Sequence, residues 1–117
     1  MPRMVPSDES ILTHLRRGAL EFCVLALLQR GEWYGLDIAR RLSLDGVLLH
    51  GEGTLYPLLA RLRRAGHVET SWRESTAGPP RRYYTLTPDG LQALETFRAT
   101  WVPFRNAVDS ALEGPQS

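Results

Sequence analysis

The sequence predicts a mainly α-helical protein that also carries a two-stranded β-ribbon, an α+β fold. Three segments with helical spacing of apolar residues come first, two segments of period-two alternation follow, and another helical segment comes last. A chain of 117 residues with 43% apolar residues is long enough for one domain with a modest core, and too apolar for a disordered chain. A dimer that shares its core would bury more apolar surface than a chain of this length buries alone.

The first two predicted helices cover residues 11–29 and 36–42. The first is free of proline, apolar on two faces, and stops before Gly31. A helix with two apolar faces has two partners, its own core and a second subunit. Asp45-Gly46 marks a turn before the next helix. Residues 1–10 are interpreted as a flexible arm and residues 114–117 as a tail.

The third predicted helix lies in the stretch EGTLYPLLARLRRAGHVE and stops at Gly66. Thr54, or a residue just before it, can cap the start, and Pro57 is tolerable in the first turn. The inner face holds apolar residues at spacings of three and four: Leu55, Leu58, Leu59, Leu62 and Ala65. The outer face is small or flat at its start and cationic at its end: Gly53, Tyr56, Pro57, Ala60, Arg61 and Arg64. Arg63 points to the side.

Two strands are expected after this helix. HVETSWRES and RRYYTL both alternate with period two, and STAGPP between them is turn material. Arg81 and Arg82 open the second strand at the tip of the ribbon, and Trp72 is interpreted as a core residue. Trp33 and Tyr34, at the junction of the first two helices, are interpreted as packing residues.

The last predicted helix covers residues 87–113. Thr87 is its expected N-cap and Pro88 its first residue. A heptad-like seam along it predicts a dimer interface: Leu94, Phe97, Trp101, Phe104, Val108 and Ala111. Pro103 interrupts the seam, so we expect a kink or weak point there.

Three helices followed by a ribbon describe a winged helix-turn-helix over residues 11–86, with residues 87–113 as a dimerisation helix. All basic residues are arginine, and residues 52–86 hold six arginines against three acids. Arginine forks suit phosphates and guanine edges. The predicted DNA contacts come from the third helix, the ribbon and Tyr34: Tyr34, Thr54, Tyr56, Pro57, Arg61, Arg64, Arg81 and Arg82.

Catalysis, metal binding and membrane insertion find no support in the sequence. No glycine-rich loop follows a strand, no serine has a nucleophile motif, and we expect neither an enzyme nor a cofactor. His14, His50, His67 and Cys23 lack the spacing of a metal site, and Cys23 is interpreted as a small buried apolar residue. No apolar run approaches 18 residues and MPRMVPSDES has no signal-peptide core, so we expect a cytoplasmic protein.

The motifs GTLYPLLARLRRAGHVETSW and GPPRRYYTLTPDG, with LALLQRGEWYGLDI before them, resemble the PadR family of bacterial transcriptional regulators over about residues 15–108. The single C-terminal helix is similar to that of the small subfamily, which includes multidrug-sensing repressors. The resemblance implies a homodimer, repression of a nearby operon, and release by a small molecule.

In the multidrug-sensing branch, a tryptophan of the last helix lines a pore at the dimer centre and stacks on planar aromatic compounds. Trp101 falls at the matching position, and Leu15, Gly18 and Phe22 match the facing positions of the first helix. Phe97 and Phe104 flank Trp101, so the pore is either open to an aromatic effector or filled by these rings.

Two functions from different classes therefore stand. The first is a dimeric repressor that binds double-stranded DNA at a pseudo-palindromic operator with half-sites one helical turn apart. The second is a winged-helix protein–protein interaction module that does not bind DNA. Counterion release separates them, because only DNA binding weakens steeply as salt rises.

Overall fold

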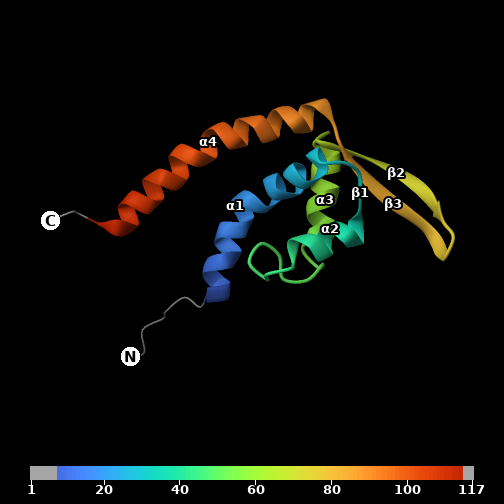
Figure 1. Cartoon of the computed structure of the whole chain (residues 1–117), viewed down its shortest axis with the longest axis horizontal. Helices are drawn as coiled ribbons and strands as arrows, with labels where there is room; N and C mark the ends of the chain where they lie inside the picture. The colour runs from blue at the N-terminus through green and yellow to red at the C-terminus, as the bar shows by residue number, and fades with distance from the viewer. Residues whose placement is uncertain (1–7, 115–117) are drawn as a thin grey trace.

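The computed structural model describes residues 8–114, in which helices and strands follow one another in the order α1, β1, α2, α3, β2, β3, α4 (Figure 1). The helices are α1 (Asp8–Gln29), α2 (Gly35–Leu42), α3 (Leu55–Arg64) and α4 (Pro88–Glu113). The strands are β1 (Trp33–Tyr34), β2 (Val68–Ser75) and β3 (Gly78–Leu86). The predicted class, mainly helical with a small antiparallel sheet, is confirmed. Among the described residues, no helix is both long and apolar enough to cross a bilayer.

Helix α1 begins at Asp8 rather than at the predicted Ile11. Asp8 and Glu9 occupy its first turn, where carboxylates favour the positive end of the helix dipole. Thr13 Oγ1 donates a hydrogen bond of 2.8 Å to the carbonyl of Glu9. Residues 8–10 of the predicted arm therefore belong to α1. The other residues of the arm, 1–7, lie outside the described part of the chain. The same is true of tail residues 115–117.

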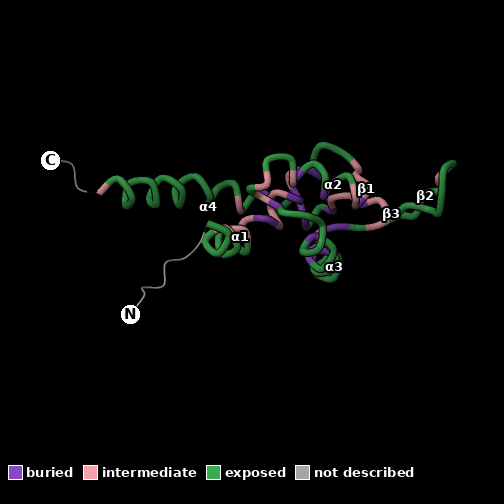
Figure 2. Tube along the Cα trace, turned by 90° about the horizontal axis from the view of Figure 1, so that it is seen from below, coloured by how far each residue is buried: buried purple, intermediate pink, exposed green. Residues whose placement is uncertain are grey.

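One hydrophobic core joins the second half of α1 to α2, α3, the sheet and the start of α4 (Figure 2). Helix α3 contributes four leucines, each at most 5% exposed: Leu55, Leu58, Leu59 and Leu62. Burial of one such side chain contributes about 1.5–3 kcal/mol. These leucines therefore fix which face of α3 remains outside. Ala65, predicted on the inner face, is exposed because the helix has already ended at Arg64.

The sheet has three strands in the order β1-β3-β2, one more than predicted. The added strand, β1, is only two residues long, and it pairs Trp33 with Tyr84 and Tyr34 with Tyr83. Strands β2 and β3 form a hairpin, hereafter the wing, whose register pairs Val68 with Leu86 at its base and Ser75 with Gly78 near its tip.

Trp72 is not a core residue, contrary to the prediction from its alternation with Val68 and Thr70. Its side chain is 64% exposed, whereas Val68 on the same face is 2% exposed. The wing extends beyond the helices that cover its base (Figure 1), so the same face is buried near the base and open towards the tip. The period of a strand assigns a face, and the helices decide how much of that face is covered.

Thr87 joins the end of β3 to α4 and to the segment that follows α3. Its hydroxyl accepts a hydrogen bond of 3.0 Å from Gly90 N, which confirms the predicted N-cap. The same hydroxyl donates a bond of 2.6 Å to the carbonyl of Gly66, and Thr87 N donates one of 3.1 Å to the carbonyl of His67. A Cβ at Gly90 would lie 2.1 Å from that His67 oxygen, so only glycine permits this approach.

Beyond its first turns, α4 projects from the body of the protein and is exposed on all sides (Figure 2). The molecule measures 62 × 36 × 23 Å, and α4 extends along the longest dimension (Figure 1). The helix continues through Pro103 without a break, although its path changes direction along its length (Figure 1). Pro103 therefore does not end the helix.

Candidate nucleic-acid interface

Helix α3 presents a face that the core leaves uncovered. Its exposed residues include Tyr56, Pro57, Ala60, Arg61, Arg63 and Arg64. Pro57 lies in the first turn, where its lack of an N–H costs no hydrogen bond. Thr54 occupies the N-cap position, one of the two predicted alternatives, but its side chain makes no capping hydrogen bond. Leu55 N instead donates a hydrogen bond of 3.1 Å to the carbonyl of Glu52, so backbone geometry starts the helix.

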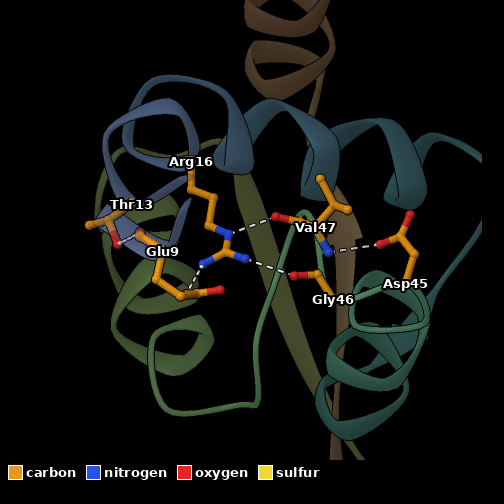
Figure 3. Close-up of polar contacts among 6 residues, drawn as sticks. All are labelled: Glu9, Thr13, Arg16, Asp45, Gly46 and Val47. Carbon is orange, nitrogen blue, oxygen red and sulfur yellow. Dashed lines mark hydrogen bonds and ion pairs between the residues drawn. The ribbon is translucent and has the colours of Figure 1, made fainter. Parts of the chain in front are cut away.

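Arg16 ties the loop before α3 to α1 (Figure 3). Its Nε donates a hydrogen bond of 2.7 Å to the carbonyl of Val47, and another nitrogen donates one of 2.8 Å to the carbonyl of Gly46. Asp45 Oδ1 accepts a bond of 3.0 Å from Val47 N, and Gly46 adopts a φ of +72°, as the predicted turn requires. Arg16 therefore holds the segment that positions α3. Sequence periodicity gave no signal for it, because its partners are backbone carbonyls about thirty residues away.

The arginines of α3 point to opposite sides of the helix. Arg61 lines a hollow of about 370 Å³ between α3 and the first half of α1, together with Arg17 and His50. Arg63 and Arg64 line a hollow of about 400 Å³ on the side of the wing. Arg63, which the helical spacing assigned to a lateral position, thus lies with Arg64 in the same hollow.

The two arginines predicted at the tip of the wing lie back from it and on opposite faces. The strands end at Ser75 and Gly78, so the tip is formed by the residues between them, whereas Arg81 and Arg82 pair with Arg73 and Trp72. Arg82 faces α3 and lines the same hollow as Arg63 and Arg64. Its guanidinium lies 4.8 Å from the centre of the Trp72 ring.

Arg81 belongs to the other face of the sheet. Its guanidinium lies 4.8 Å from the centre of the Tyr34 ring, and Arg73 lies at the same distance from the Tyr83 ring. The two tyrosine rings are 5.9 Å apart, and Arg73 also forms an ion pair with Glu32. The ring of Tyr34 therefore contacts the guanidinium of Arg81 on this face of the sheet. This pair lies on the face of the sheet opposite to Arg82, which lines the hollow with Arg63 and Arg64.

Tyr56 stands on the outer edge of α3 with its ring against Gly35, where an added Cβ would lie 3.4 Å from the ring. The side chain is partly packed, and the residue is 45% exposed. Burial, followed by the negative charge of Glu52, raises the pKa of Tyr56 above its usual value. Like any tyrosine phenol at neutral pH, that of Tyr56 is protonated and can donate a hydrogen bond.

The arginines of α3, together with Arg82 of the wing, form no ion pair with a carboxylate among residues 8–114. The ion pairs in that range are Arg16–Glu9, Arg40–Asp37, Arg73–Glu32 and Arg98–Glu95. Arg61, Arg63, Arg64 and Arg82 belong to none of them. Arg63, Arg64 and Arg82 line a hollow that has no carboxylate in its lining, whereas Glu9 and Glu21 line the hollow of Arg61. An excess of positive charge without ion pairs suits a surface that binds phosphates.

The predicted dimer and effector residues form a row of rings that leaves the core along α4. Phe22 of α1 stacks on Phe97 with centres 4.3 Å apart, and Trp101 continues the row at 5.7 Å from Phe97. Phe104 follows at 6.4 Å from Trp101 and is 61% exposed. Hereafter these four residues are the aromatic row.

The remaining residues of this prediction divide into two groups. Leu94 is 1% exposed and belongs to the core of its own chain, so its assignment to a dimer interface is wrong. A heptad pattern does not distinguish an intramolecular contact from an intermolecular one. Val108 and Ala111 are exposed on the projecting part of α4. Leu15 and Gly18 are exposed on the first half of α1, where a Cβ added to Gly18 would meet no atom within 4 Å.

The described residues contain no group of three or more histidine, cysteine or acidic side chains placed to hold a metal ion. Cys23 is half-buried, and burial raises the pKa of its thiol. A raised pKa keeps the thiol protonated and lowers its reactivity. Cys23 therefore has the character of a packing residue.

Comparisons with known proteins give one consistent result. The family model described as the transcriptional regulator PadR-like family matches residues 24–96. A PadR family transcriptional regulator from Eggerthella lenta is similar in structure, with a TM-score of 0.79 and 34% identity over 92% of this chain and 93% of that one. A PadR-like transcriptional regulator from Bacillus cereus has a TM-score of 0.76 and 33% identity over 87% and 99%. An uncharacterised protein from Lysinibacillus sphaericus is 27% identical over 84% of this chain and 92% of its own length.

Proposed function

The chain belongs to the PadR-like family of transcriptional regulators, and from this membership we propose a dimeric repressor that small aromatic molecules release from DNA. The family implies regulation through DNA binding rather than catalysis. The observation that carries the proposal is the exposed face of α3, whose arginines have no acidic partners among the described residues. Such a face attracts the phosphates of a duplex.

In the proposed complex, the N-terminal part of α3 enters the major groove. Tyr56 and Pro57 are placed there by the leucines that anchor the opposite face, and Thr54 precedes them at the helix start. Arg61 and Arg64 extend from the second half of the helix, and the wing crosses the neighbouring backbone. The proposed contacts are Tyr34, Thr54, Tyr56, Pro57, Arg61, Arg64, Arg81 and Arg82.

The exposed part of α4 supports the proposed homodimer. Trp101, Phe104 and Val108 are each at least 39% exposed although they form one seam, and an isolated helix exposes such a seam to water at a cost. Residues 11–86 would then form the DNA-binding unit and residues 87–113 the dimerisation helix. Two α3 helices about 34–36 Å apart would contact successive half-sites of a pseudo-palindrome.

The aromatic row supports the proposed effector site. Trp101 is 39% exposed and stacks on only one neighbour closely, so a planar aromatic compound would find a free ring face. Leu15 and Gly18 of the facing helix would complete the site in the dimer. The compound would release DNA only to the extent that it binds better to the dimer spacing that does not fit the operator.

The test is fluorescence anisotropy of a labelled fragment upstream of this protein's own gene, against scrambled DNA, at about 50 and 200 mM salt. We expect selective binding that weakens steeply with salt. The double variant Arg61→Ala/Arg64→Ala should lose at least about tenfold in operator affinity. The matched control is Arg30→Ala/Arg105→Ala, which removes the same charge away from α3. Equal binding by all three proteins would refute the recognition surface.

Effector binding has a separate test. Planar aromatic compounds should quench the fluorescence of the wild-type protein, and Trp101→Phe should remove most of that quenching. Trp33→Phe is the control, because Trp33 packs against the core away from the aromatic row. Quenching that persists in Trp101→Phe would argue against this site.

A further inference from the structure

A cleft of about 400 Å³ separates α3 from the wing. Its basic lining residues come from both elements, because Arg63 and Arg64 belong to α3 and Arg82 belongs to β3. The other lining residues are aromatic or small and apolar: Tyr56, Leu59, Ala60 and Tyr84. No carboxylate is among them. Three guanidinium groups therefore share one hollow without an acid to neutralise them, which favours an anion as occupant.

Arg82 is held in place more firmly than the other two. The flat face of Trp72 lies 4.8 Å below its guanidinium, and the two residues are direct partners in the β2–β3 register. A cation–π contact of this kind restricts the orientation of the guanidinium fork. It also explains why a tryptophan stands 64% exposed on the wing.

One polar atom of this arginine is unsatisfied. Nε of Arg82 is buried and has no hydrogen-bond partner among the described residues. A buried donor without a partner is costly, so its burial calls for an explanation, of which an ordered water or an ion is one. Tyr56 also lines the cleft, and its phenol, protonated at neutral pH, adds a further donor there.

We propose that Arg63, Arg64 and Arg82 bind one backbone phosphate of DNA in this cleft, and that Trp72 is the positioning residue for Arg82. The proposal rests on the proposed function. With α3 in the major groove and the wing over the neighbouring minor groove, the strand between the grooves passes between these two elements. A phosphate on that strand would meet the forks of all three arginines, which bind phosphate oxygens in pairs.

This assignment separates two roles on α3. A phosphate contact contributes affinity for any sequence, whereas contacts to base edges contribute selectivity. Arg63 and Arg82 should therefore bind operator and non-operator DNA equally well. Arg61 lies in the hollow on the other side of α3, away from the cleft, and remains available for base edges.

The experiment measures anisotropy with operator and scrambled duplexes over a salt series. Arg63→Ala and Arg82→Ala should each weaken binding to both duplexes by the same factor, between about 10 and 100. Each should also lower the slope of log affinity against log salt, by no more than about 1, because the three arginines share one phosphate. Arg82→Lys keeps the charge without the fork, so it should retain the salt slope but not the full affinity. Arg61→Ala is the contrast, because it should reduce the ratio of operator to scrambled binding.

Trp72 is tested by rescue and by coupling. Trp72→Leu should weaken binding to both duplexes, and Trp72→Phe should restore most of the loss because it keeps an aromatic face under Arg82. In the Arg82→Ala background, Trp72→Leu should have no further effect. A merely structural role for Trp72 would give the same loss in both backgrounds. Thermal unfolding of each variant confirms that it is folded.

The outcomes separate this proposal from the one on which it rests. A folded wild-type protein that binds no DNA would refute both. Wild-type binding with unchanged affinity and salt slope in Arg63→Ala and Arg82→Ala would refute the cleft alone. A changed ratio of operator to scrambled binding in these variants would also refute it, because it would show contact with bases.

Discussion

Helices α3 and α4 are both amphipathic, but only α3 has its apolar face covered within one chain. The four leucines of α3 are at most 5% exposed, whereas Phe104 of α4 is 61% exposed and Val108 is 39% exposed. The apolar face of α3 is therefore fully buried within a single molecule. The apolar seam of α4 is buried only at Leu94, and from Trp101 onwards its residues are exposed to water. In the proposed function, the exposed face of α3 would therefore be ready for DNA in one chain, whereas the exposed seam of α4 would be covered only in a dimer.

The largest effect should follow from a change beneath α3. Leu59 is 0% exposed, so Leu59→Ala should lower the free energy of unfolding by about 2–5 kcal/mol. Leu44 is the matched control, because it is 73% exposed and Leu44→Ala should change this free energy by less than about 0.5 kcal/mol. Urea unfolding at one protein concentration measures both. Similar losses would show that the core around α3 is not as the structure has it.

The next effect should concern assembly. Phe104→Ala should raise the dissociation constant of the proposed dimer about 30-fold or more, equivalent to about 2 kcal/mol, because most of the Phe104 side chain is uncovered in its own chain. Val102 is 45% exposed but lies off the seam, so Val102→Ala should leave the constant nearly unchanged. Sedimentation over a dilution series measures it. If the two variants dissociate alike, the seam is not the interface.

A third effect should appear where the two regions meet. Gly90→Ala forces a Cβ against the carbonyl of His67, and it should lower the free energy of unfolding by about 1–3 kcal/mol. Operator binding should fall as well, because α4 must shift relative to α3. Thermal unfolding and anisotropy measure the two quantities. An unaffected Gly90→Ala protein would mean that the first turn of α4 packs less closely than the structure shows.

The smallest effect should distinguish a free helix surface from a hidden interface. Gly18→Ala meets no atom in its own chain, so it should raise the stability of the monomer by about 0.8–1 kcal/mol through helix propensity. If a partner's α4 packs against Gly18, the same change should also weaken the dimer. The Gly18→Ala protein should therefore show a higher free energy of unfolding as a monomer and, in sedimentation, a weaker dimer. A dimer as tight as that of the wild type would place the partner elsewhere on α1.

Local patterns predicted most of the fold. The apolar spacing of α3, Pro57 in its first turn and Gly66 after it gave the helix within a residue or two, and Thr87-Pro88 gave the start of α4. Strand β1 was missed because two residues are too few to show a period. Its partner lies in β3, which only the folded chain brings close.

The site was predicted less completely because its geometry is tertiary. A helical wheel places Arg63 beside the recognition face, but it does not say that the wing will lie on that side. Alternation gave Trp72 the face of Val68 without showing that the helices stop short of it. Arg16 binds carbonyls of a distant loop, and no local pattern marks such a contact.

The bonds of Thr87 have a mechanical consequence. They fix the base of α4 to the segment just after α3, so any tilt of α4 would pivot at a point beside α3. A helix of 26 residues is about 39 Å long, and a tilt of about 5° at its base displaces its far end by about 3 Å. In the proposed dimer, an aromatic compound inserted near the middle of α4 would tilt the helix about this base, which lies beside α3.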